Sequence, residues 1–526
     1  MYTQENGFYI AHGPDGPISI LGNMANRHGL IAGATGTGKT VTLQVIAESF
    51  CKAGVPCFMA DMKGDLSGIS QPGKMSGFIE KRLPEFGIQQ ESLTFEGCPV
   101  RFYDVYGEQG TPMRATIGEM GPDLMARIMG LNDTQTGVLN ILYRILDDKG
   151  ILLDDVKDLR SALDWLSRHA KEYTTQYGNV STASIGAIQR ALLHLENQGA
   201  DKFFGMPSFD INDLMETRDG KGVLSVLAAD KLMMQPKLYS TFLLWLLSEL
   251  YSTLPEVGDL EKPKLIFFFD EAHMLFEETS KALTDKIEQV IRLIRSKGVG
   301  IFFISQLPTD IPDIILGQLG NRVQHALRAY TPRDQKAVKV AAETFRANPD
   351  FKTDEAITQL ETGEALVSFL DEKGAPSVVQ RAKVLFPLSQ IGAITQGQRL
   401  DIMNANRDIN AKYQEATDRE SVFEVFAREA EDEAKAAEEA EAAKQAEKEE
   451  KSKKKEKTLW DKIWKSVVTA VTATLASIVG KKVSDTVTGK KSKDTSIKDV
   501  AGRAAKNATS AAGRQILRDI LGNIAK

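Results

Sequence analysis

Cysteine is scarce in this sequence, and long hydrophobic runs are absent from it. Only 3 of the 526 residues are cysteines, too few for a disulfide framework and without zinc-finger spacing, which is typical of a reducing cytoplasm. The longest uncharged apolar stretch, 466–480, has about 15 residues, whereas a helix that crosses a bilayer needs roughly 20. The first residues also lack a basic start followed by an apolar run. We therefore expect neither a transmembrane helix nor a secretory signal.

Charge of one sign is not in large excess either. The 65 Lys and Arg residues against 71 Asp and Glu give a net charge of −6. This balance excludes a chain coated with basic residues for nucleic acid, although a local basic patch is compatible with it. With 42% hydrophobic residues, most of the chain can bury a core, and the length predicts about three domains of roughly 150 residues.

Short apolar runs alternate with helical patterns from about residue 29 to 386, which predicts an α/β fold with a mostly parallel sheet and crossover helices. The runs show little polar alternation, as expected for strands covered on both faces. Residues 1–28 predict a short β segment with Gly-Pro turns. The expected core strands span 30–32, 56–60, 223–228, 265–269, 299–305, 323–329 and 365–370.

Between residues 122 and 217 the apolar residues recur at helical spacing, and few strand signals are present. A structureless loop of this length would be unusual in a compact domain. We therefore expect a mostly helical insertion, which divides the core into residues 29–121 and 218–403.

The composition changes after residue 404. Residues 424–450 contain 11 acidic and 4 basic residues among many alanines, so 404–457 is predicted to be a helical or disordered linker. Residues 458–526 then form an amphipathic and basic tail that includes Trp460 and Trp464. We expect this tail to pack on the core or on a partner protein; the alternative is an anionic membrane surface.

The strongest motif is a glycine-rich turn that follows an apolar strand and precedes a helix predicted at 40–50. It fits the phosphate-binding pattern G-x-x-x-x-G-K-[ST] at every fixed position. Its glycines let backbone N–H groups turn toward phosphates, and the helix N-terminus adds positive potential. Lys39 would neutralise the β- and γ-phosphates, and the Thr40 hydroxyl would bind Mg²⁺. The motif consists of Gly33, Ala34, Thr35, Gly36, Thr37, Gly38, Lys39 and Thr40.

A second motif is the apolar run 264–269 that ends in Asp270 and Glu271. Ligands of α/β folds bind at the carboxyl ends of the strands, so both carboxylates are expected at the site edge. Asp270 would hold Mg²⁺ directly or through water. Glu271 would orient and deprotonate the attacking water.

Other strand ends are expected at the same edge. Gln306 follows the run 300–305 and can sense the γ-phosphate or position water, because its amide both donates and accepts. The segment 61–65 (DMKGD) ends the strand after the phosphate-loop helix. Its Asp61 and Lys63 would contact the metal shell or pair with each other.

Arginines and histidines give weaker signals. Arg292 and Arg295 end an amphipathic helix predicted at 281–297, where cations either balance the helix dipole or form an arginine finger for a neighbouring subunit. Arg322 is a weaker candidate for that role. None of the six histidines has metal-ligand spacing, and His273 is expected to be a loop or coupling residue.

Together, the phosphate loop, the DMKGD strand end, the helical insertion, the Asp270–His273 segment and Ser305-Gln306 resemble the HerA/FtsK class of ring ATPases. Within that class the chain looks most similar to the YjgR-like branch of bacterial proteins with a HerA-type helicase C-terminal domain. The resemblance covers about residues 29–386. It implies a RecA-like core, a hexameric ring, ATP and Mg²⁺ bound at subunit interfaces, and movement of double-stranded DNA through the pore.

By the family pattern, Lys39, Thr40, Asp270, Glu271 and Gln306 carry over, and Arg295 stands at about the position of the arginine finger. The favoured hypothesis is a cytoplasmic, ATP-driven DNA translocase or helicase-like motor. Two alternatives stay open: a protein-handling ATPase resembling type IV secretion and conjugation motors, and a slow nucleotide-dependent assembly switch. A DEAH-box RNA helicase is not favoured, because the region after residue 386 lacks the alternating strands of a second RecA-like domain.

Overall fold

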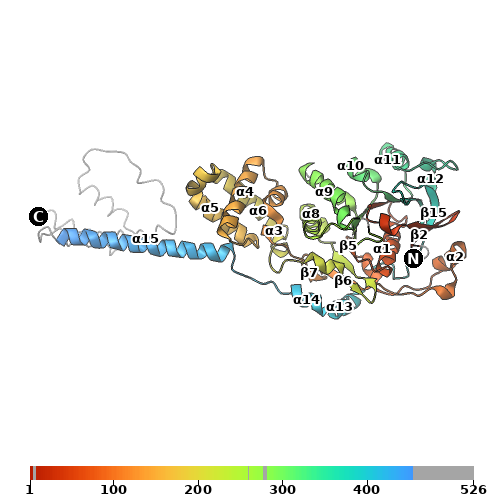
Figure 1. Cartoon of the computed structure of the whole chain (residues 1–526), viewed down its shortest axis with the longest axis horizontal. Coiled ribbons are helices and arrows are strands. Elements are labelled where there is room, and N and C mark those ends of the chain that lie inside the picture. Colours follow the sequence, from red (N-terminus) through yellow and green to blue (C-terminus); the bar gives the residue numbers. More distant parts are fainter. Residues whose placement is uncertain (4–6, 259, 277–280, 454–526) are drawn as a thin grey trace, which may run out of the picture. The chain divides into compact units, whose positions relative to one another are not determined.

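The fold is built on one large sheet, whose central strands are parallel. Helices α1 (Lys39–Lys52), α8 (Pro236–Thr253) and α9 (Lys281–Ile294) lie around it in Figure 1. The computed structural model describes residues 1–3, 7–258, 260–276 and 281–453. The sheet has 13 strands in the order β1-β2-β15-β14-β13-β4-β12-β11-β5-β10-β6-β7, with β3 paired to β2. The parallel strands, in spatial order, are β13 (Asn321–Gln324), β4 (Gly29–Ala32), β12 (Val299–Ser305), β11 (Leu265–Phe269), β5 (Cys57–Asp61), β10 (Leu224–Ala228), β6 (Val100–Asp104) and β7 (Thr111–Pro112).

The other end of the sheet is antiparallel, and it includes the N-terminal β segment. Here β2 pairs with β15, so the first strands extend the main sheet. A separate two-stranded sheet pairs β8 (Thr217–Arg218) with β9 (Lys221–Gly222). The antiparallel strands are β1 (Tyr2–Thr3), β2 (Gly7–Gly13), β3 (Gly16–Ile20), β14 (Glu364–Ser368) and β15 (Gln380–Val384).

The sheet is buried on both faces, as its apolar strands predict. Leu30 and Ala32 of β4 belong to one hydrophobic cluster, and Ile31 belongs to another. Helix α1 contributes to the second cluster, whereas α8 and α9 contribute to the first. Helices therefore cover opposite faces, which confirms the predicted α/β class. Shorter helices are α2 (Gly77–Phe86), α10 (Asp313–Leu316), α11 (Pro332–Glu343) and α12 (Thr353–Gln359).

Between β7 and β8 the chain is mostly helical. Three of the helices begin with capping boxes, at Thr116, Asn132 and Asp155, which satisfy backbone N–H groups of the first turn. Their apolar sides join the first hydrophobic cluster. The helices are α3 (Ile117–Ile128), α4 (Asp133–Lys149), α5 (Val156–Tyr177), α6 (Thr182–Glu196) and α7 (Ala200–Phe203).

The charged region after residue 404 does not begin as a separate linker. The compact unit extends from Met1 to Glu429, and a second unit begins at Ala430. Residues 404–429 stay with the first unit because apolar side chains stand among their charges; Tyr413 is fully buried, and Phe426 stacks on Trp165 at 4.5 Å between ring centroids. The helices are α13 (Gln396–Ala405), α14 (Arg407–Tyr413) and α15 (Val422–Lys453).

The described part of the second unit is the continuation of α15. The predicted amphipathic and basic tail, with Trp460 and Trp464, lies outside the described residues. Within the described ranges, no helix is both long enough and apolar enough to span a bilayer.

Candidate active site

The phosphate-binding motif forms the turn between β4 and α1. Gly36 and Gly38 have φ angles of 78° and 113°, which side-chain-bearing residues rarely adopt. Helix α1 begins at Lys39 and has no side-chain cap, so its N-terminal N–H groups face the turn. The Lys39 ammonium donates hydrogen bonds to the carbonyl oxygens of Gly33, at 2.6 Å, and Ala34, at 3.1 Å. Thr40 lies in the first turn of α1 and is half-buried.

The loop is held from below by the strands on either side of β4. Ala34 N–H donates to the Ala326 carbonyl at 2.8 Å, and Gly33 N–H donates to the Ser305 carbonyl at 3.3 Å. His325 also bonds to the Thr42 hydroxyl, at 2.8 Å from Nε2. Burial lowers the pKa of His325 to about 4, so this imidazole is neutral at pH 7. The phosphate loop and the start of α1 are therefore held by backbone hydrogen bonds and by a neutral histidine.

The paired acids follow β11, two strands from β4. Asp270 and Glu271 are 6% and 7% exposed, which is low for carboxylates. Burial, and then the neighbouring Glu271 charge, raise the pKa of Asp270 to about 6. Glu271 has φ 48° and ψ 48°, a left-handed conformation that is uncommon for glutamate and is found mainly where the surrounding structure imposes it.

Lys63 pairs with Glu271 and not with Asp61. The Lys63 Nζ lies 2.5 Å from Glu271 Oε1. Although burial works in the opposite direction, this hydrogen bond and charge hold the pKa of Glu271 below its usual value. Asp61 is buried, and its Oδ1 has no hydrogen-bond partner in the described part of the chain. Burial, followed by the charge of Asp65, raises the pKa of Asp61 to about 7.

Gln306 lies at the same edge, directly after β12, which pairs with both β4 and β11. Burial raises the pKa of Glu271, but Lys63, then His273 and last Gln306 lower it, and the pKa is below its usual value overall. His273 lies in the loop behind the acids, with Nδ1 3.4 Å from Glu271 Oε2. The structure thus brings the glycine turn, the acids and the amide together. Burial lowers the pKa of Lys39, and the nearby charges of Glu271 and Asp270 partly oppose this shift.

The three candidate arginines, Arg292, Arg295 and Arg322, do not reach the strand-end site of their own chain. Arg295 is half-buried and stands four residues before β12, at the amino ends of the parallel strands. The seven residues of β12 span roughly 23 Å at about 3.3 Å per residue, so Arg295 lies far from Gln306. Arg292 is exposed, with its guanidinium 3.9 Å from Glu288. Arg322 donates to the carbonyl oxygens of Leu319, Thr344 and Leu316, which is a structural use of its guanidinium.

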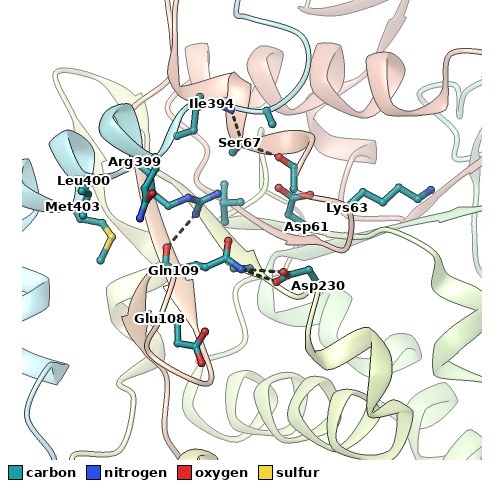
Figure 2. A pocket seen from close by; sticks show the side chains of 15 residues that line it. Asp61, Lys63, Ser67, Glu108, Gln109, Asp230, Ile394, Arg399, Leu400 and Met403 are labelled. Atoms are coloured by element: carbon teal, nitrogen blue, oxygen red, sulfur yellow. Dashed lines mark hydrogen bonds between the residues drawn. The ribbon is translucent and has the colours of Figure 1, made fainter.

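A pocket of about 480 Å³ lies beside the acids, at the ends of β5 and β10. Its walls include Asp61, Lys63, Asp230 and Arg399 (Figure 2). Gln109 connects two walls, because it donates to Asp230 at 2.9 Å and accepts from Arg399 at 3.1 Å. Figure 2 shows that the Lys63 ammonium points away from Arg399.

The residues at the strand ends fit a magnesium-bound nucleoside triphosphate. The uncapped N-terminus of α1 and the open glycine turn suit phosphate oxygens. The raised pKa of Asp270 and the unpaired Oδ1 of Asp61 indicate carboxylates that a divalent cation would stabilise. Lys39 and α1 would hold the phosphates, and Thr40 and Asp270 would hold the cation.

Sequence reasoning missed the contacts of His325 and the pairing of Lys63 with Glu271. Both depend on the strand order, which puts β13 beside β4 and β5 beside β11. For the contacts of His325, the glycine at position 33 is a local sign in the sequence, because a Cβ at that position would meet His325.

The chain is similar to known helicases. A probable helicase of Methanocaldococcus jannaschii is 30% identical over 125 residues, 23% of this chain and 22% of that protein. The DNA double-strand break repair helicase HerA of Sulfurisphaera tokodaii is 21% identical over 361 residues, 68% of this chain and 65% of that protein. This chain thus spans less than two thirds of either relative.

Among solved structures, the bacterial conjugative coupling protein TrwBdeltaN70 covers 75% of this chain and 92% of its own, at a TM-score of 0.48 and 15% identity. This likeness is too low to support any inference about function. The family model described as helicase HerA-like C-terminal matches residues 8–526. The chain therefore belongs to the HerA-like helicase C-terminal family.

Proposed function

We propose that this protein is an ATP-hydrolysing ring motor that acts on DNA in the cytoplasm. The observation that carries the proposal is the convergence of Lys39, the Asp270–Glu271 pair and Gln306 on neighbouring strand ends. The related HerA helicase is named for DNA double-strand break repair, which favours double-stranded DNA as the partner. The three cysteines, all free and buried, fit a reducing compartment.

In this proposal Lys39 and the N–H groups of α1 bind the β- and γ-phosphates, while Thr40 and Asp270 hold Mg²⁺. The bound cation supplies charge neutralisation at the phosphates. Glu271 accepts the proton of the attacking water, and the Gln306 amide orients that water. With these roles, the residues at the strand ends would together hydrolyse ATP.

The position of Arg295 favours a ring, proposed here as a hexamer. Because Arg295 lies at the amino ends of the strands, it cannot serve the nucleotide of its own chain. In a head-to-tail ring, the amino-end side of one subunit can face the strand ends of the next. Arg295 would then stabilise transition-state charge in the neighbouring site.

The test is ATP turnover with Mg²⁺ at low salt, in the presence and absence of double-stranded DNA, single-stranded DNA and RNA. Mass determination in the presence of ATP accompanies it, because a finger acting between subunits requires an oligomer. We expect stimulation by double-stranded DNA and a ring-sized mass. Absence of nucleic-acid stimulation, together with absence of DNA retention at low salt, would contradict the DNA motor and favour a protein-handling ATPase or an assembly switch.

A further inference from the structure

Lys63 forms an ion pair with Glu271, the carboxylate that the proposed reaction needs as its base. Its two residues follow neighbouring parallel strands, β5 and β11, and the Nζ–Oε1 distance is 2.5 Å. A general base must accept a proton from water through one of its carboxylate oxygens. The lysine ammonium competes with water for that oxygen.

The pair also fixes one oxygen of the Glu271 carboxylate against Lys63, which follows β5. Strand β11 lies between β12 and β5, and the loop follows β4, on the far side of β12. The second oxygen, Oε2, is buried, with His273 Nδ1 3.4 Å away, so this oxygen is also shielded from water.

The two partners differ in their access to solvent. The Lys63 side chain is 50% exposed, whereas that of Glu271 is 9% exposed. Lys63 also forms part of the wall of the 480 Å³ pocket, and its ammonium is turned out of that pocket (Figure 2). A half-exposed lysine can exchange a carboxylate for water at little cost, so the pair can open from the lysine side without unfolding the site.

We propose that Lys63 is a positioning residue that restrains Glu271 in this ion pair, and that the pair must open before Glu271 can act on water. This inference rests on the proposed role of Glu271 as the base. Lys63 touches neither the phosphate loop nor the attacking water in this account. Its effect on turnover is exerted through Glu271 alone.

The test uses Lys63→Met, which keeps a long apolar stem and removes the charge, with Lys63→Arg as the matched control that keeps it. We expect Lys63→Met to raise the kcat for ATP without DNA by about two- to fivefold, as expected for loss of one partly exposed ion pair. The KM for ATP should stay within about twofold, because binding is left to the phosphate loop. Lys63→Arg should stay close to the unsubstituted protein.

A fall of kcat in Lys63→Met, or no change in it, would overturn the proposal. Lys63→Gln, a second neutral variant, guards against a folding defect, and thermal melting together with binding of a non-hydrolysable ATP analogue verifies both variants. Equal kcat in both neutral variants and in the unsubstituted protein would also overturn it.

The Lys63→Met/Glu271→Gln double variant separates this inference from the proposed function. If Lys63 acts through the base, the double variant should be as slow as Glu271→Gln. A double variant as fast as Lys63→Met would contradict the coupling. Unchanged turnover in Glu271→Gln itself would instead remove the proposed base, and the basal assay does not depend on DNA being the partner.

Discussion

Gly33 lies so close to His325 that a Cβ placed on the glycine would stand 2.5 Å from the Cβ of His325. Real Cβ atoms do not approach so closely, and neither the loop backbone nor the first carbon of the His325 side chain can move aside freely in a well-packed interior. Gly33, the first glycine of the phosphate loop, is thus required because His325, directly after β13, leaves no space for a side chain. Gly36, in the same loop, has no heavy atom within 4 Å of such a Cβ.

This contrast predicts different effects for two substitutions in one loop. Gly33→Ala should displace the loop and weaken binding of a non-hydrolysable ATP analogue by about tenfold or more, which corresponds to roughly 1.4 kcal/mol. Gly36→Ala meets only the backbone strain of a left-handed alanine, about 1–2 kcal/mol. Because this strain is present with and without nucleotide, binding should weaken less than in Gly33→Ala. Calorimetric titration of both variants measures the difference. Stronger impairment in Gly36→Ala than in Gly33→Ala would contradict the role assigned to His325.

The position of Arg295 predicts complementation between subunits. Arg295→Ala should keep nucleotide binding and lose about a hundredfold or more in turnover, as expected for a missing arginine finger. Mixed rings of Arg295→Ala and Glu271→Gln subunits should regain activity, since some interfaces then join an intact Glu271 to an intact Arg295. ATP turnover of mixed and separate variants measures this.

The control for that experiment is Arg292→Ala, which removes an exposed arginine three residues away. It should leave turnover within about twofold, as for most surface substitutions. If mixing restored nothing, Arg295 would be a structural residue and the finger would have to be sought elsewhere.

His28 predicts a loss of stability in mild acid. Its Nε2 bonds to the Ile291 carbonyl and its Nδ1 accepts from Ile301 N–H, so a protonated ring would lose the second bond. Burial lowers the pKa of His28 from 6.5 to about 4. Between these values the unfolded chain binds a proton that the folded chain does not, so stability falls as the pH falls below 6.5.

This one residue should contribute a loss of about 1.6 kcal/mol between pH 6.5 and pH 5, because the slope rises from half of about 1.4 kcal/mol per pH unit to nearly all of it over this range. His28→Asn, a residue that tolerates the φ of 56°, should be less stable at pH 7 but less dependent on pH. Urea unfolding at several pH values, with the exposed His194→Asn as control, measures the slopes. Equal slopes in His28→Asn and in the unsubstituted protein would contradict the assignment.

The apolar runs predict most of the parallel sheet, because strands covered on both faces need continuous apolar sequence. The runs at 265–269 and 299–305 coincide with β11 and β12. The run at 323–329 does not: β13 ends at Gln324. The next residues are apolar for another reason, since Ala326 and Leu327 pack against α11 and α12.

Strand β6 is not predicted, because Arg101 interrupts its apolar pattern. That arginine is buried and pairs with Glu216 and with Asp408, at 2.7 Å from the latter. Partners so distant in sequence leave no local signal. The same is true of the candidate site. The apolar runs predict that Asp270 and Gln306 lie at strand ends, but the pairing of Lys63 with Glu271 depends on the strand order, which the runs do not give.

The role of Glu271 as the base is tested most directly by single-turnover and steady-state ATP hydrolysis by Glu271→Gln, with Lys39→Ala as the binding control. We expect Glu271→Gln to bind ATP and Mg²⁺ with nearly unchanged affinity and to turn over about a hundredfold or more slowly. Lys39→Ala should lose binding as well, because its ammonium serves the phosphates. Unchanged turnover in Glu271→Gln would contradict the account, since the acids after β11 would then not act on the nucleotide held after β4.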